Sequence, residues 1–129
     1  MKYTLAIHGA PYASQSAQHG LALAQALLAQ EHTIVRVFFF HEGVYQALST
    51  RVVPQGEEDL LSKWQELGQH GVELAVCIAG GIKRGVISEE ERQRYEKQSS
   101  SLAEHFTLVG LGQLISAINE TDRYIEFPA

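Results

Sequence analysis

Hydrophobic residues along the chain alternate between short β-rich runs and longer stretches with helical spacing. The run at residues 37–40 is continuously apolar, which is typical of a strand covered on both faces. By contrast, Leu60, Trp64 and Leu67 recur at the spacing of one helix face. Together these patterns predict strands at residues 2–8, 33–40, 72–78, 106–109 and 123–127, and helices at about 14–30, 57–69, 89–97 and 111–119.

Strands that alternate with helices favour a parallel sheet covered by helices on both faces. We therefore expect a three-layer α/β/α sandwich with a mostly parallel sheet of about five strands. The chain has no internal repeats and no linker-like change in composition. A single domain spanning residues 1–129 is expected, since this length supports one hydrophobic core.

Two features of the helices bear on contacts with other chains. Ser88 followed by Glu91 is a capping box, and the helix that it starts is polar almost all round. Such a helix is either fully solvated or covered by another chain. Trp64 is interpreted as core or interface packing. We expect the isolated chain to oligomerise, with the polar helix, Trp64 and the phenylalanine-rich strand as sources of contacts.

Composition and charge narrow the class of protein. With 45% hydrophobic and 19% charged residues, the chain is typical of a soluble globular domain. Its net charge of −5 comes without a basic stripe, so we expect no direct contact with nucleic acid. No apolar run has the length of a membrane span, and the N-terminus lacks the features of a signal peptide. A single cysteine cannot form an internal disulfide, which favours the cytoplasm.

Cys77 is the candidate for chemistry because it ends the buried strand at residues 72–78. In α/β sheets the reactive crevice lies just beyond the carboxyl ends of the strands. A thiol reacts as its thiolate, and Lys83, Arg84 or a helix N-terminus nearby favours that form. The alternative is inert packing, because cysteine is among the most buried residue types.

Other residues are expected to surround this thiol. Gly80 and Gly81 keep bulk away from the sulfur and allow backbone N–H groups to face an anion. His41 and Glu42 follow the second strand, and His8 ends the first, so all three are expected at the same edge of the sheet. There they would activate a thiol or orient a partner. Alternatively they are solvated residues at strand ends, which is the interpretation favoured for His8.

The sequence predicts neither a metal nor a cofactor. No paired spacing of cysteine and histidine supports a metal site. The turn at residues 9–12 has neither of the glycine patterns that bind phosphate groups. A module that binds a flavin or nucleotide at a strand end is therefore the weaker alternative.

Four blocks spread over nearly the whole chain form one recognisable pattern: residues 38–45, the strand ending in Cys77 with residues 83–86, residues 106–114, and Asp122-Arg123 with Phe127. Together these blocks resemble the DsrE/TusD family, most closely its TusD branch. The resemblance implies a single α/β domain. It also implies that the position of Cys77 carries a sulfane sulfur as a persulfide.

The resemblance further implies a place in a sulfur relay. Such a chain accepts sulfur from a TusA-like donor and passes it to a TusE-like acceptor, toward 2-thiouridine at the wobble position of tRNA. It does so in a hetero-oligomer with TusB- and TusC-like subunits. Having one cysteine suits a carrier, since a second would resolve the persulfide as a disulfide. The alternatives are a DsrE-like role in sulfur oxidation and a non-catalytic structural subunit.

Overall fold

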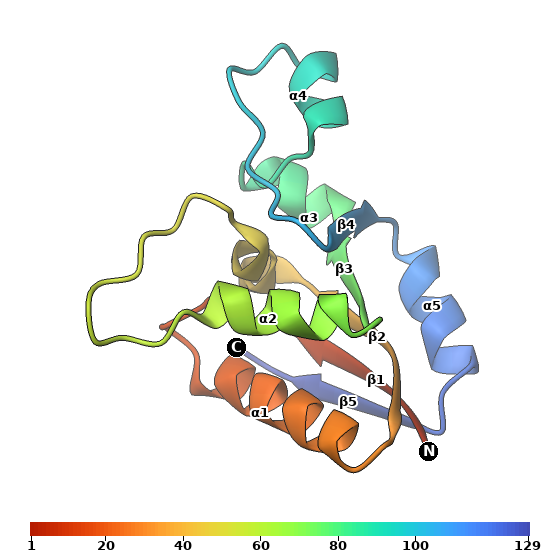
Figure 1. Ribbon diagram of the computed structural model, residues 1–129. Coiled ribbons are helices and arrows are strands. Elements are labelled where there is room, and N and C mark those ends of the chain that lie inside the picture. Colours follow the sequence, from red (N-terminus) through yellow and green to blue (C-terminus); the bar gives the residue numbers. More distant parts are fainter.

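The fold is built on one five-stranded sheet, shown in Figure 1 by the computed structural model, which covers residues 1–129. The strand order is β4-β3-β2-β1-β5, and every neighbouring pair is parallel. The α/β fold predicted from the sequence is therefore confirmed, with a sheet that is parallel throughout. The strands are β1 (Lys2–Ile7), β2 (Thr33–Phe39), β3 (Glu73–Cys77), β4 (Phe106–Val109) and β5 (Arg123–Phe127).

Helices lie on both faces of this sheet. The strands need this cover because their side chains alternate between the two faces and both faces carry buried residues. Leu5 and Ile7 point into the main core beneath α1 (Gln15–Ala29) and α2 (Leu60–Gln69). Thr4 points the opposite way, because successive strand residues alternate between faces. Its hydroxyl donates to the Ala117 carbonyl of α5 (Gly112–Asn119), at 3.4 Å. The alternation thus separates the two helical layers.

Trp64 lies in the main core. It is 1% exposed, and its ring meets Phe39 edge-on with centroids 5.0 Å apart. The indole N–H donates to Oε1 of Gln46 at 3.1 Å, which satisfies the one polar group of the ring. Core packing is therefore confirmed for Trp64. It follows that Trp64 is not available as a contact between chains, contrary to one of our expectations.

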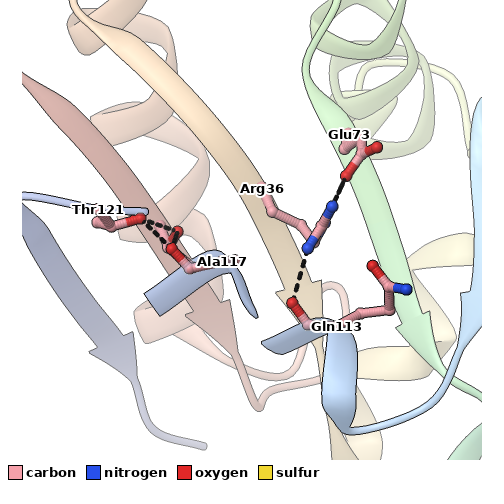
Figure 2. Close-up of polar contacts among 6 residues, drawn as sticks. Arg36, Glu73, Gln113, Ala117 and Thr121 are labelled. Carbon is pink, nitrogen blue, oxygen red and sulfur yellow. Dashed lines mark hydrogen bonds and ion pairs between the residues drawn. The ribbon is translucent and has the colours of Figure 1, made fainter. Parts of the chain in front are cut away.

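The second helical layer is a single short helix held to the sheet by polar contacts (Figure 2). Arg36 of β2 donates to the Gln113 carbonyl of α5 at 2.6 Å and forms an ion pair with Glu73 of β3. Close to the other end of the helix, the Thr121 hydroxyl donates to the Ala117 carbonyl. These contacts fix the position of α5 without burying its apolar side.

Several elements differ from those predicted. The helix predicted at 57–69 begins only at Leu60, because the Asp59 side chain caps it by accepting from the Ser62 N–H at 3.2 Å. Residues after β2 form a 3₁₀ helix, η1 (His41–Ala47), which the sequence did not predict. The residues after Cys77 form a second short helix that the sequence analysis did not predict, α3 (Ile78–Lys83), and Ile78 belongs to this helix and not to the predicted strand.

The capping box at the start of α4 (Glu89–Arg94) is confirmed, although this helix ends before residue 97. The backbone N–H of Ser88 donates to Oε1 of Glu91 at 3.2 Å, and the Ser88 hydroxyl bonds to the same oxygen. These bonds, the hydroxyl first, lower the pKa of Glu91. Figure 1 shows α4 projecting beyond the edge of the sheet above α3. None of the helices has the length and apolarity needed to span a membrane.

Candidate functional site

Cys77 lies at the carboxyl end of β3, next to Val109 of β4 in the parallel register. Strand alternation places it on the same face as Ala75, the face that carries α5. Its thiol is free and half-buried. It lines an open pocket of about 380 Å³, whose walls are His8, Phe40, His41, Cys77, Ala79, Gly80, Lys83, Arg84, Leu111 and Glu126.

The two predicted cations both line this pocket, but in different ways. Lys83 is exposed and makes no ion pair. Arg84 donates to the Gly80 carbonyl at 3.2 Å and pairs with Glu42, with 3.3 Å between Nη2 and Oε1. Glu42 therefore reaches the pocket only through Arg84. The mobile positive charge near the thiol belongs to Lys83, whereas Arg84 is held in place.

The two predicted glycines have separate positions. Gly80 lies in the pocket wall. Gly81 is buried on the other side of α3, where an added Cβ would stand 3.0 Å from the Val86 carbonyl oxygen and 3.1 Å from Leu108. The absence of a side chain at Gly81 lets α3 pack closely against the sheet, and Gly81 does not line the pocket.

The helix η1 brings His41 beside His8. Gly43 is buried so close to β1 that an added Cβ would stand 2.2 Å from the Ile7 carbonyl oxygen. This approach sets η1 against the end of β1, and His41 begins η1 with a φ of 47°. The Nδ1 atoms of His8 and His41 are 3.1 Å apart, within hydrogen-bonding distance. His8 also stacks on Phe40, with centroids 5.2 Å apart.

Glu126 of β5 completes this side of the pocket and is bonded to Tyr124 of the same strand, and the sequence analysis selected neither residue. Oε1 of Glu126 lies 3.7 Å from Nε2 of His8 and accepts from the Tyr124 hydroxyl at 2.8 Å. Burial, followed by the bond to Glu126, raises the pKa of Tyr124 above its ordinary value. Because sequence order does not reveal that β5 lies beside β1, no sequence signal placed these residues near Cys77.

The arrangement combines one thiol, two linked imidazoles and two cations around an open pocket. It places a free thiol and two cationic side chains in the walls of one pocket. No group of three histidine, cysteine, aspartate or glutamate side chains is arranged to hold a metal ion. A thiol of this kind has the chemistry for substitution at sulfur, and an imidazole can accept or donate a proton.

Sequence comparison identifies relatives that match the chain over nearly its whole length. The Sulfurtransferase TusD homolog of Vibrio cholerae serotype O1 is 41% identical over 128 residues, covering 98% of both chains. Sulfurtransferase TusD of Salmonella dublin is also 41% identical over 128 residues, covering 98% of this chain and all of the relative.

Structure comparison gives the same fold. The YchN protein of E. coli superposes with a TM-score of 0.80 at 21% identity, covering 98% of this chain and 99% of the other. MTH1491 from Methanobacterium thermoautotrophicum superposes with a TM-score of 0.64 at 15% identity, over 97% of each chain. The model of the DsrE/DsrF-like family matches residues 1–127. The resemblance predicted from the sequence is thereby confirmed, and the chain belongs to the DsrE/DsrF-like family.

Proposed function

We propose that this chain is a sulfurtransferase that carries a sulfane sulfur as a persulfide on Cys77. The observation that carries the proposal is the free, half-buried thiol opening on a pocket at the end of β3. The 41% identity to proteins named sulfurtransferase TusD supports it. In this proposal residues 1–129 act as one domain in the cytoplasm, without a cofactor or metal.

The transfer takes two substitutions at sulfur. The Cys77 thiolate attacks the outer sulfur of a donor persulfide, the donor's S–S bond breaks, and the donor leaves as a thiolate. Cys77 then holds the sulfur as Cys–S–S⁻. An acceptor thiolate attacks that outer sulfur and releases the Cys77 thiolate. Because the chain has no second cysteine, the persulfide has no internal thiol with which to form a disulfide.

The cations around the pocket stabilise the two anionic states of Cys77. Lys83 is free to move toward a thiolate or a persulfide anion, since no carboxylate holds it. Arg84 is fixed by Glu42 and by the Gly80 carbonyl, so it contributes a stationary positive charge and shapes the pocket wall. Gly80 leaves room for the outer sulfur.

The same proposal places the chain in a relay toward 2-thiouridine at the wobble position of tRNA. A TusA-like protein donates the sulfur, a TusE-like protein accepts it, and TusB- and TusC-like subunits share the assembly. The names of the relatives support this placement. With a net charge of −5 the chain is not suited to bind tRNA alone, so a partner makes that contact.

Mass spectrometry after incubation with a protein persulfide donor tests the proposal. We expect the wild-type chain to gain the mass of one sulfur atom and to lose it on reduction with a thiol. Cys77→Ser should gain none. The matched control combines Cys77→Ser with Ser49→Cys, which moves the only thiol to an exposed turn that lines no pocket.

We expect the moved thiol to accept sulfur much more slowly than Cys77, because it lacks the pocket and its cations. Equal loading of the moved thiol and of Cys77 would show that the pocket contributes nothing. A wild-type chain that stays unloaded, while still supporting the relay in an assembly, would instead identify a structural subunit.

A further inference from the structure

Four side chains form a line of polar contacts at the end of the sheet where Cys77 lies. The line runs from Tyr124 to Glu126, His8 and His41, with 2.8, 3.7 and 3.1 Å between successive polar atoms. His8, His41 and Glu126 line the same pocket as Cys77. In the proposed transfer, Lys83 and Arg84 stabilise the sulfur anion. Neither of them accepts the proton that the Cys77 thiol must lose, so another group is needed for that step.

The Glu126 carboxylate, which lies between Tyr124 and His8 in this line, favours one placement of the protons on the two imidazole rings. Glu126 only accepts hydrogen bonds when ionised, so an N–H on Nε2 of His8 is favoured over a lone pair facing the carboxylate. Nδ1 of His8 is then an acceptor, and Nδ1 of His41 must donate to it across 3.1 Å. That assignment leaves Nε2 of His41 unprotonated and able to accept a proton.

We propose that His41 takes the proton of the Cys77 thiol and returns it to the departing donor thiolate, with His8 and Glu126 as positioning residues. This inference rests on the proposed sulfur transfer. The S–H bond of Cys77 breaks and an N–H bond forms at Nε2 of His41. Sulfur attack then forms one S–S bond and breaks another, and the leaving thiolate takes the proton from His41. No net oxidation or reduction occurs.

Five residues other than glycine have a positive φ, and His41 is the one of them that lines the Cys77 pocket. Its φ of 47° lies in the left-handed region, which is uncommon outside glycine, asparagine and aspartate. The buried contact of Gly43 with Ile7 holds the turn in that conformation. Strained residues of this kind concentrate at functional sites, where the surrounding structure fixes them.

Charged groups from two elements surround the histidine pair, His8 and His41. Lys83 and Arg84 of α3 line the same pocket, and Arg84 is paired with Glu42. Glu126 of β5 is the carboxylate that directly faces the pair, and its neighbour Tyr124 keeps its proton and so remains a donor to it. The positive charge that His41 gains is therefore balanced through His8 by Glu126.

The rate of alkylation of Cys77 by iodoacetamide, measured against pH, tests the inference. Wild type should react at neutral pH, since the pair removes the thiol proton. His41→Gln should lower that rate about tenfold, shifting the midpoint of the profile upward by about one pH unit, and the rates should converge at alkaline pH. His8→Gln and Glu126→Gln should shift the midpoint in the same direction by less.

The control is His19→Gln, which changes an exposed histidine of α1 outside the pocket and should leave the profile unchanged. A His41→Gln profile that superposes on the wild-type profile overturns the inference. So does a shift of equal size in His19→Gln. Convergence at alkaline pH distinguishes a lost proton acceptor from a damaged pocket, which would lower the rate at every pH.

Nitrogen-15 NMR of the histidine rings tests the same inference on the unaltered chain, so that a variant that fails to fold does not leave it undecided. In the neutral state we expect the proton of His41 on Nδ1 and that of His8 on Nε2. A proton on Nε2 of His41 overturns the inference. Neither measurement uses a sulfur donor. A wild-type chain that gives these results but accepts no sulfur would therefore reject only the proposed function.

Discussion

At the scale of single residues, the structure separates two cations that the sequence could only place together. Lys83 is free at the pocket, whereas Arg84 is tied to Glu42 and to the Gly80 carbonyl. A free ammonium group follows the charge of the sulfur during transfer, and a fixed guanidinium group does not. The two residues should therefore respond differently to substitution.

We expect Lys83→Met to slow the loading of Cys77 by about three- to fivefold at low ionic strength, because one nearby positive charge is lost. The difference from wild type should shrink as salt is added. The measurement is the initial rate of sulfur uptake from a persulfide donor, followed by mass spectrometry at several salt concentrations.

Lys97→Met is the matched control, since Lys97 is exposed and lies outside the Cys77 pocket. If Lys97→Met slows loading as much as Lys83→Met, the effect comes from net charge and not from Lys83 in particular. A difference from wild type that persists unchanged at high salt would mean that Lys83 acts by its shape and not by its charge.

The candidate site was predictable where strand ends determined it. Cys77 and His41 follow long apolar runs, so the topology of α/β sheets placed them correctly at one edge. Glu126 was not predictable, because its closeness to His8 depends on β5 pairing with β1. The pattern of side chains along one strand shows which residues face the core, but it does not show which other strand lies beside it. For His8, the favoured interpretation as a solvated residue missed its contacts with His41 and Glu126.

At the scale of elements, the strands were predicted to within one residue, whereas the helices η1 and α3 were not predicted. Buried apolar runs specify strands directly. The two short helices η1 and α3 have no apolar period, and α3 contains Gly80 and Gly81, which are poor helix formers. Packing against the end of the sheet stabilises both, and such contacts are not visible in the local sequence.

The capping box of α4 leads to a prediction of stability against pH. The pKa of Glu91 is lowered in the folded state from its ordinary value of 4.5, so its carboxylate contributes stability above that value. This contribution is lost as pH falls through the lowered pKa. We expect Glu91→Gln to reduce the free energy of unfolding by about 1 kcal/mol at neutral pH.

Urea denaturation at several pH values measures this effect. The difference between wild type and Glu91→Gln should be constant near neutrality and should shrink once the pH falls below 4.5. Glu104→Gln, at an exposed position, is the control and should change stability little at any pH. A difference that does not depend on pH would show that the packing of Glu91, and not its charge, stabilises α4.

At the scale of the whole molecule, the two helical layers are unequal. The layer of α1 and α2 covers a large core, whereas α5 alone covers part of the other face. Leu111, at the N-cap of α5, and Ile115 and Ile118 within it are 56%, 61% and 37% exposed. Contiguous apolar side chains of this size on a surface mark contacts with other proteins. Leu111 also lines the Cys77 pocket, so this surface continues to the rim of the site.

We expect these exposed side chains, and not the buried Trp64, to supply contacts between chains if the protein oligomerises. Burying an isoleucine at an interface contributes about 1.5–3 kcal/mol, so Ile115→Gln should weaken association about tenfold or more. Folding stability should change little, because Ile115 is exposed in the single chain. Sedimentation velocity over a range of concentrations, with thermal unfolding of the same samples, measures both quantities.

The matched control is Val52→Gln, which removes an apolar side chain that is 90% exposed and stands apart from α5 on the loop before α2. Equal weakening by the two substitutions would show that association depends on general surface hydrophobicity, and an unchanged oligomer in Ile115→Gln would place the interface on another face of the molecule.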